Sequence, residues 1–410
     1  MRTAITLLIV FFAGFQMFAQ SDFPEFDQSS GKQSVLALHG SILGGSDYLN
    51  MPFVKAYYNS GFLDQSLKEK AFDQLKNLNH LGVIFGLGIS YQKSGLSKGP
   101  FHQIRLIAGH EDIVEAKFDE ELFGLYFFGN KRYENIRAQF DNSSFDVLRY
   151  QYLKFGADRK IGKWMASGQI GLAFGQEMRE LKINKGSLFT AEGGKSLELD
   201  LELKSIFTDQ ENKSLLSIQG IGIVSDWALG YQLNEVTKIS VGINRLGFIR
   251  WNDQLTGEQV DTNYFFDGLA VNNLFDSIYV ELKSEEALEN QFLEPLPNVN
   301  KNIRLPFEWR LNFQTLLMNR KIFLSSSVAY MPSRALGAFG AVRCSYHWTP
   351  WLWAGVSGGF GIYNSWNLGV SCSAYIKGYR LDIDSNSLVN WLLADQAASV
   401  NGQIRVSRYF

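Results

Sequence analysis

Histidine and cysteine are the residue types in this chain that could bind a metal ion, and their spacing predicts no such site. Five histidines occur, and no two of them stand four residues apart, as a zinc-binding helix requires. His102 and His110 fall on one predicted strand, where a rise of roughly 3.3 Å per residue separates them by about 27 Å. No Cys-x-x-Cys pair is present. We therefore predict no metal site and no cofactor.

A serine hydrolase needs a serine, a histidine and a polar group that orients the histidine. Ser345 and His347 share one face of a predicted strand, but Ser345 stands near Arg343 with no nucleophile motif around it. A phosphate-binding Gly-rich loop with Lys and Ser or Thr is also absent. Single acids such as Glu308 do not provide the carboxylate pair that glycoside hydrolysis uses. We predict no catalytic residue and no enzymatic activity.

Charged and amide side chains on the polar faces of predicted strands form the main candidate site. In a barrel, such residues either line a solute path or pair into networks that fill and rigidify the lumen. A loop folded inward as a plug would favour the second interpretation. The lumen-facing candidates are Arg105, Asp226, Glu308, Arg310, Asn312, Arg343 and Arg405.

The elements that must carry these side chains show a repeated period of two, which is typical of β-strands with one apolar and one polar face. Between residues 305 and 317, Glu308, Arg310 and Asn312 alternate with apolar residues. The predicted apolar face of this segment consists of Leu305, Phe307, Trp309, Leu311, Phe313 and Leu317. The same division occurs at 83–92 and at 164–175.

Two lengths of connection join these segments. Short ones lie near 97–100, 159–163, 234–238, 319–321, 349–351 and 377–378, and long ones near 44–79, 119–145, 184–216, 252–302 and 387–400. Bacterial outer-membrane barrels have short periplasmic turns and long outer loops. We predict an all-β fold, a transmembrane antiparallel up-and-down β-barrel of about fourteen strands, with short helices in long extracellular loops or a plug. This count treats 197–207 as an extracellular β excursion and could change by two strands.

The first residues and the composition of the chain indicate where in the cell the protein resides. Residues 1–19 have a positive charge, an apolar core and a small last residue, which predicts a secretory signal peptide and a barrel domain over 20–410. No later window of eighteen apolar residues occurs, so membrane residence requires a closed β-barrel. The net charge of −2 means that the protein has no excess of positive charge with which to bind nucleic acid. Cys344 and Cys372 are expected as small apolar residues on the lipid face.

The last ten residues alternate and end on an aromatic residue, as the closing strand of an outer-membrane barrel does. Gly402, Ile404, Val406 and Phe410 fall on one face, and Gln403, Arg405, Ser407 and Tyr409 on the other. We expect Ile404, Val406 and Phe410 to be the signal that the barrel-assembly machinery reads, and outer-membrane lipid to be the surrounding partner.

The predicted long loops contain helical and aromatic stretches. Ser66 and Glu69 form a capping-box pattern ahead of a helix at 62–77, and 284–293 is a weaker case. The aromatic side chains either remain exposed as a partner surface or pack on each other as a lid. They are concentrated at Met51, Phe53, Tyr57, Tyr58 and Phe62, and at Leu122, Phe123, Tyr126, Phe127 and Phe128.

Three stretches carry a family resemblance: LFGLYFFGNKRY at 122–133, INKGSLFTAEGGKSLELDLEL at 183–203, and NRLGFIRWN at 244–252. Together they resemble an uncharacterised family of outer-membrane β-barrels of Bacteroidota, similar in architecture to the long-chain fatty-acid transporter class. The resemblance implies a barrel of about fourteen strands and no particular chemistry. Arg408 departs from the usual barrel ending, where an aromatic or aliphatic residue faces lipid.

Three functions remain open at this point. The first is transport of a small hydrophobic or amphipathic ligand through the barrel. The second is a non-transporting barrel that anchors loops docking a secretion or envelope protein complex. The third is a soluble secreted β protein, which alternation alone permits. We favour transport over docking only because barrels of this architecture include transporters.

Overall fold

The computed structural model describes residues 33–59, 63–96, 99–208, 217–251, 255–267, 292–296, 299, 301–332, 337–361, 365–388 and 397–410. The predicted signal peptide and the helix predicted at 284–293 lie outside or almost wholly outside these residues. Among the described helices, none is long and apolar enough to cross a membrane.

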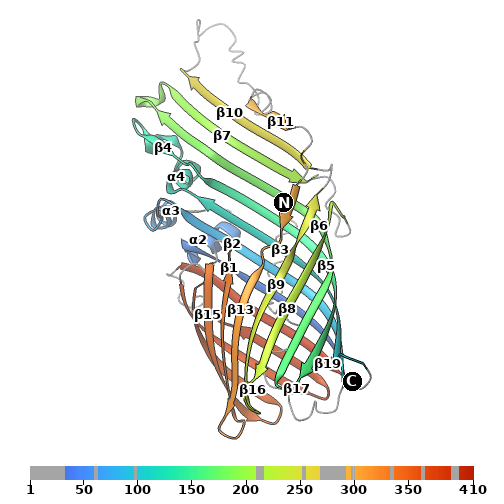
Figure 1. Cartoon of the computed structure of the whole chain (residues 1–410). Coiled ribbons are helices and arrows are strands. Elements are labelled where there is room, and N and C mark those ends of the chain that lie inside the picture. The colour runs from blue at the N-terminus through green and yellow to red at the C-terminus, as the bar shows by residue number, and fades with distance from the viewer. Residues whose placement is uncertain are drawn as a thin grey trace.

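The described strands form a closed antiparallel barrel (Figure 1). Fourteen of the nineteen described strands pair in a ring, which closes where the first and last strands pair. The strands of the ring are β1 (Ser34–Asn50), β2 (Asn79–Ser94), β3 (Gln103–Phe118), β5 (Ser143–Ile161), β6 (Trp164–Thr190), β8 (Gly220–Gln232), β9 (Thr237–Trp251), β13 (Glu308–Leu317), β14 (Ile322–Met331), β15 (Gly337–Thr349), β16 (Leu352–Gly361), β17 (Ser365–Ile376), β18 (Tyr379–Ser385) and β19 (Ala397–Tyr409). The predicted fold and strand number are confirmed.

Five further strands extend the sheet beyond the ring: β4 (Arg137–Gln139), β7 (Leu197–Thr208), β10 (Leu255–Phe266), β11 (Glu294–Leu296) and β12 (Lys301–Arg304). β7 pairs with residues 179–190 of β6 and with β10. It is therefore an extension beyond the ring and not one of its strands, as predicted for 197–207. Figure 1 shows β7 and β10 projecting past the end of the barrel.

Short turns lie at the barrel end that also holds the two described chain ends. Ser34 and Phe410 exchange backbone hydrogen bonds of 3.0 Å there. The turn between β17 and β18 has positive φ at Lys377 and Gly378, 50° and 85°, which matches the twist of a two-residue hairpin. The short turns and both described chain ends therefore lie on one side of the barrel.

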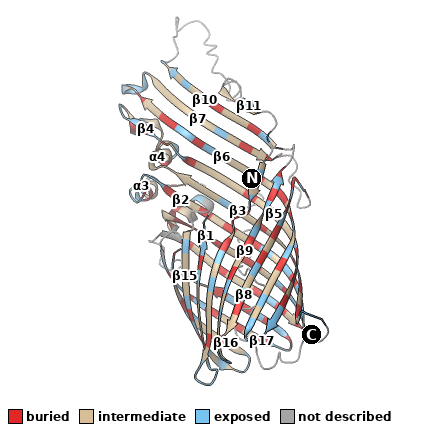
Figure 2. Ribbon diagram, viewed as in Figure 1, coloured by how far each residue is buried: buried red, intermediate tan, exposed pale blue. Residues whose placement is uncertain are grey.

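Burial alternates along the strands of the ring, as the sequence period requires (Figure 2). Outward positions carry large exposed apolar side chains, and Cys344 and Cys372, exposed and half-exposed, lie among them. Leu305 is an exception and the prediction for it was wrong. It is 1% exposed because the chain leaves the strand pattern between β12 and β13, and its side chain turns inward.

Three helices gather at the long-loop end, beside the ends of β1 and β3 (Figure 1): α2 (Met51–Asn59), α3 (Gln65–Phe72) and α4 (Glu120–Phe128). Their apolar side chains pack into one group, which we call the rim cluster. It contains Leu49, Phe53, Leu63, Ala71, Leu75 and Phe123, with Phe72, Phe127 and Phe128 against it.

The rim cluster shows that most of the loop aromatics pack on each other, which agrees with the second of the two alternatives, a lid. The Phe123 and Phe127 ring centroids lie 4.4 Å apart, whereas Tyr126 remains 71% exposed. The side chains of Met51, Tyr58 and Phe62 lie outside the described part. The predicted cap of α3 was wrong: Asp64, not Ser66, is the N-cap, because the helix begins two residues earlier and the Asp64 carboxylate accepts from the Leu67 amide at 2.9 Å.

Candidate functional site

The inner wall of the barrel is built from two unlike halves. From β3 to β9 it carries large side chains that reach into the lumen, among them Arg105, Tyr150, Lys154, Arg245 and Trp251, all buried. From β14 to β17 about half of its inward positions are serine or glycine, and Ala329 and Ala341 are also small. One half therefore fills the lumen and the other leaves space.

Arg245 is the centre of the filled half. β9 carries an irregularity opposite Asp226, and Arg245 there adopts a left-handed φ of 58°. The Arg245 amide donates to Oδ1 of Asp226 at 2.8 Å, which holds this backbone conformation. The side chain then points into the lumen, where it is almost completely buried.

The Arg245 guanidinium joins strands from opposite parts of the ring. It lies 3.4 Å from Oε2 of Glu111 on β3 and 3.8 Å from Oε2 of Glu308 on β13. Tyr150 donates its hydroxyl proton to Glu111 at 2.7 Å, and Arg310 Nε donates to Glu308 at 2.7 Å. We call these five residues the Arg245 network. Removing charges from water is costly, so such a group is stable only when every charge is paired, as here.

Two more groups of ion pairs line the wall. Lys154 Nζ donates to Asp226 at 2.6 Å, and Arg105 pairs with Asp158 and donates to Ser167. On the other half, Arg343 pairs with Asp384, and Arg380 Nε lies 2.8 Å from Asp382.

Of the seven residues predicted to face the lumen, five are buried and two are partly buried: Arg105, Asp226, Glu308, Arg343 and Arg405 are buried, and Arg310 and Asn312 are intermediate. The structure brings Glu308 and Arg310 together in the Arg245 network, while Asp226 joins that network to Lys154. Arg105, Arg343 and Arg405 do not join the Arg245 network. Arg105 pairs with Asp158, Arg343 pairs with Asp384, and Arg405 Nε donates to Ser407 at 3.0 Å.

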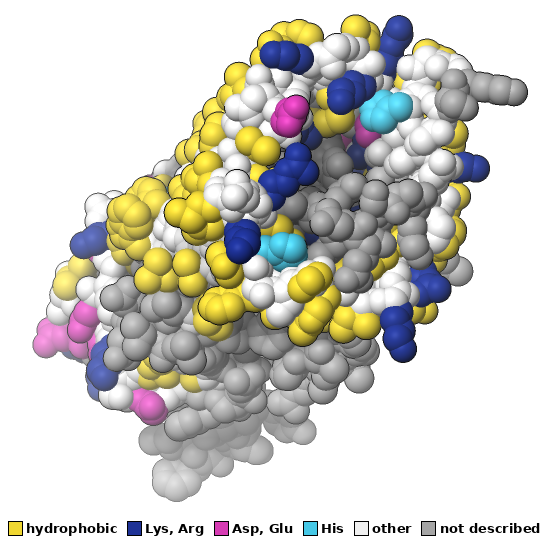
Figure 3. Space-filling model, turned by 90° about the horizontal axis from the view of Figure 1, so that it is seen from below, with side chains coloured by type: hydrophobic (Ala, Val, Ile, Leu, Met, Phe, Trp, Pro, Cys, Tyr) yellow, Lys and Arg dark blue, Asp and Glu magenta, His cyan; other side chains and the backbone are white. Residues whose placement is uncertain are grey.

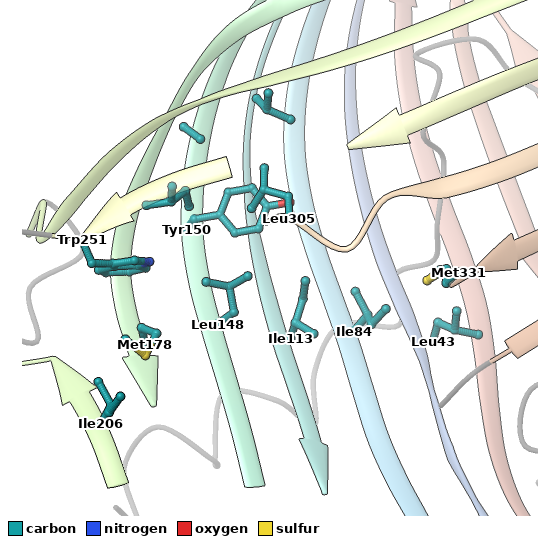
Figure 4. Close-up of a cluster of buried hydrophobic side chains, with 13 residues drawn as sticks. Leu43, Ile84, Ile113, Leu148, Tyr150, Met178, Ile206, Trp251, Leu305 and Met331 are labelled. Carbon is teal, nitrogen blue, oxygen red and sulfur yellow. The ribbon is translucent and has the colours of Figure 1, made fainter. Parts of the chain in front are cut away.

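Apolar side chains form a second inward layer, which we call the apolar belt (Figure 4). Its core residues are Leu43, Ile84, Ile113, Leu148, Tyr150, Ala173, Met178, Ile206, Val224, Ile249, Trp251, Leu305 and Met331. Five of them are direct neighbours across consecutive strands, from Leu43 of β1 to Met178 of β6.

Glycines make room for the largest side chain of the apolar belt. A Cβ atom at Gly175 would lie 2.4 Å from a ring carbon of Trp251, and one at Gly220 would lie 2.9 Å from it. Gly175 therefore leaves the space that the Trp251 ring occupies.

A polar hollow of about 920 Å³, including the solvent space at its mouth, lies against the other half of the wall. Its inward polar lining consists of Glu308, Arg310, Asn312, Gln314, Ser325, Ser327, Arg343, Asn367, Asp384, Asn386, Asn401 and Gln403. Leu43 and Phe339, which pack in or against the apolar belt, also line it. The hollow and the belt therefore adjoin.

Sequence reasoning missed Arg245, although a signal for it exists. The outward apolar residues of β9 stand at odd positions up to Ile243 and at even positions at Leu246 and Phe248, while Ile249 and Trp251 face inward. This change of phase requires an irregular strand between them, and Arg245 lies there. Glu111 and Tyr150 carry no comparable signal.

The other candidates for chemistry are occupied in structural contacts. Oγ of Ser345 lies 3.2 Å from Oγ of Ser371, and the His347 ring stacks on Trp353 with centroids 4.4 Å apart. No group of three or more metal-binding side chains occurs among the described residues.

A family model with the description "Family of unknown function (DUF5723)" matches residues 27–381. The chain belongs to the DUF5723 family. The match covers most of this DUF5723 protein, including twelve strands of the ring in full and the beginning of β18. A search of curated proteins finds no match. The resemblance to Bacteroidota barrels and to the fatty-acid transporter class stays a prediction.

Solved structures similar to this DUF5723 protein include several barrels. A deltaS2S3 mutant of the TodX monoaromatic hydrocarbon channel has a TM-score of 0.47 and 10% identity, and covers 93% of this chain and 92% of its own. The toluene transporter TodX of Pseudomonas putida has a TM-score of 0.39 and 10% identity, with coverages of 92% and 88%. The autotransporter NalP translocator domain of Neisseria meningitidis has a TM-score of 0.35 and 8% identity, with coverages of 94% and 91%. At these values the similarity does not bear on the function of the DUF5723 protein.

Proposed function

We propose that this DUF5723 protein is an outer-membrane channel or transporter for small amphipathic molecules. The observation that carries the proposal is the contact between the polar hollow and the apolar belt inside one closed barrel. An amphipathic solute can place its polar part in the hollow and its apolar part against Leu43 and Phe339.

The outer surface supports residence in lipid. Large apolar side chains cover the outward faces of the wall, which a barrel in water would leave as an extensive apolar patch (Figure 3). Exposed aromatic residues stand near both ends of this surface, as the girdles of a membrane barrel do. Trp164, Trp348, Trp351 and Tyr379 lie towards the short turns, and Tyr330, Phe360 and Trp366 towards the long loops.

The closing strand supports assembly in the outer membrane. Val406 and Phe410 are 44% and 55% exposed, on the outward face with Ile404, where the barrel-assembly machinery can reach them. Arg408 donates to the Lys377 carbonyl at 3.0 Å and lies over the Tyr379 ring, so its charge stays at the turn.

Reconstitution into liposomes tests the proposal. Liposomes that contain the folded barrel should admit small amphipathic solutes faster than protein-free liposomes, and heat-unfolded protein should not increase the flux. Equal influx with and without the folded barrel, across neutral and charged solutes of this size, would contradict transport.

One observation favours a second candidate, a barrel that docks an envelope protein complex. β7 and β10 project past the barrel end as a sheet with paired charges, such as Arg137 with Glu198 and Lys185 with Asp200. This candidate predicts a partner that co-purifies in mild detergent and is lost when 197–207 is deleted. Recovery of the full-length barrel alone from its native membrane would count against it.

A further inference from the structure

The charges that line the polar hollow cancel. Its described lining contains two cations, Arg310 and Arg343, and two anions, Glu308 and Asp384. Arg310 Nε donates to Glu308 at 2.7 Å, and Arg343 pairs with Asp384. An anionic solute would have to open one of these pairs and leave a carboxylate without its cation, which is strongly unfavourable for a buried group.

The rest of the polar lining is made of amides and hydroxyls. Asn, Gln and Ser side chains both donate and accept hydrogen bonds, and the hydroxyl groups of a solute do the same. Two lining oxygens, Oδ1 of Asn386 and Oε1 of Gln403, are buried and accept no hydrogen bond from the described part of the chain. A hydroxyl donor would satisfy both, whereas a carboxylate would repel them.

Space and apolar contact complete the site. Ser325 and Ser327 project little into the lumen, so the hollow remains open beside them. Phe339 presents an aromatic ring at the edge where the hollow meets the apolar belt. A ring-shaped polar group can lie in the hollow with an apolar substituent towards Phe339.

We propose that the polar hollow binds a neutral, hydroxyl-rich group of the sugar type, carried on a small apolar group, and selects against organic anions. This inference rests on the proposed transport function and specifies its substrate class.

The test compares two probes that share an aromatic ring. Phenyl β-glucoside is neutral and hydroxylated, whereas benzenesulfonate stays anionic at neutral pH. Influx of each into liposomes holding the full chain is measured by rapid filtration. The glucoside should enter about tenfold faster than the sulfonate, the ratio given by about 1.4 kcal/mol of discrimination. Equal or faster entry of the sulfonate would overturn the inference and leave transport standing, whereas entry of neither probe would refute transport itself.

Two variants locate the selectivity in the hollow. Asp384→Asn removes the partner of Arg343, so sulfonate influx should rise by about tenfold while glucoside influx is retained. Gln403→Leu should slow the glucoside and leave the sulfonate unchanged. The matched control, Ile383→Leu, changes the outward neighbour of Asp384 and should alter neither. Unchanged sulfonate influx in a folded Asp384→Asn barrel, or equal loss of both probes in Gln403→Leu, would overturn the proposal.

Discussion

Arg245→Met tests whether the Arg245 network stabilises the barrel. The substitution keeps a long unbranched side chain but removes the charge that pairs with Glu111 and Glu308. Glu308 keeps Arg310 at 2.7 Å, whereas among the described residues Glu111 keeps the Tyr150 hydroxyl but no cation. The lost stabilisation therefore concerns mainly Glu111. Breaking a buried pair costs about 3–5 kcal/mol, and the retained contacts place the expected loss of unfolding free energy at about 3 kcal/mol.

Urea titration of the folded barrel in lipid vesicles, followed by tryptophan fluorescence, measures this loss. Arg250→Met is the matched control, because Arg250 is exposed on the same strand and should change the unfolding free energy by at most about 0.5 kcal/mol. Adding Glu111→Gln to Arg245→Met should recover about 2 kcal/mol, since the buried anion is then neutral. A loss below about 1 kcal/mol for Arg245→Met, or strict additivity in the double variant, would refute the assignment.

Three further predictions concern crowding, the rim and pH. Gly175→Val should lower the unfolding free energy by about 1–3 kcal/mol in the same titration, because its Cβ would meet the Trp251 ring; a neutral effect would contradict the packing of the apolar belt. Phe123→Ala should speed amide exchange in α2 and α3 while exchange in the ring stays unchanged; uniform acceleration would show that the rim cluster is not a separate unit. Burial, together with the charges of Glu121 and Glu120, raises the pKa of Asp119 from 3.8 to about 6. The folded rim therefore binds this proton more tightly than the unfolded chain, and its stability should fall as pH rises from about 4 to about 6. Amide exchange in α4 should be slower at pH 5 than at pH 7 after correction for intrinsic rates, and Asp119→Asn should abolish the difference.

The barrel wall could be predicted from the sequence because each spanning strand must present one face to an apolar surrounding and one to the lumen. The period of two then identifies the strands, and the two lengths of connection assign the ends. The excursion at 197–207 could be assigned by the same parity, since both ends of the chain must lie beside the short turns.

The candidate site was only partly predictable, because its geometry depends on contacts between distant strands. The inward positions of Glu308, Arg310 and Arg343 follow from alternation, but which cation meets which anion does not. Arg245 and Glu111 are 134 residues apart in the sequence. Their contact also depends on the irregular part of β9, where the simple alternation of inward and outward residues does not hold. The prediction that Leu305 faces outward failed for a related reason, because the chain departs from strand geometry just before β13.

Cysteine scanning of β14 shows directly whether the polar hollow is the solute path. Ser327 lines the hollow with its inward side chain, whereas its neighbour Val328 is 55% exposed on the outward side of the strand and is not part of the lining. In a background with Cys344 and Cys372 replaced by serine, a membrane-impermeant charged thiol reagent is added to single barrels in a planar bilayer. We predict a stepwise fall in conductance for Ser327→Cys and none for Val328→Cys. Equal effects at both positions, or no effect at Ser327→Cys despite complete labelling, would contradict it.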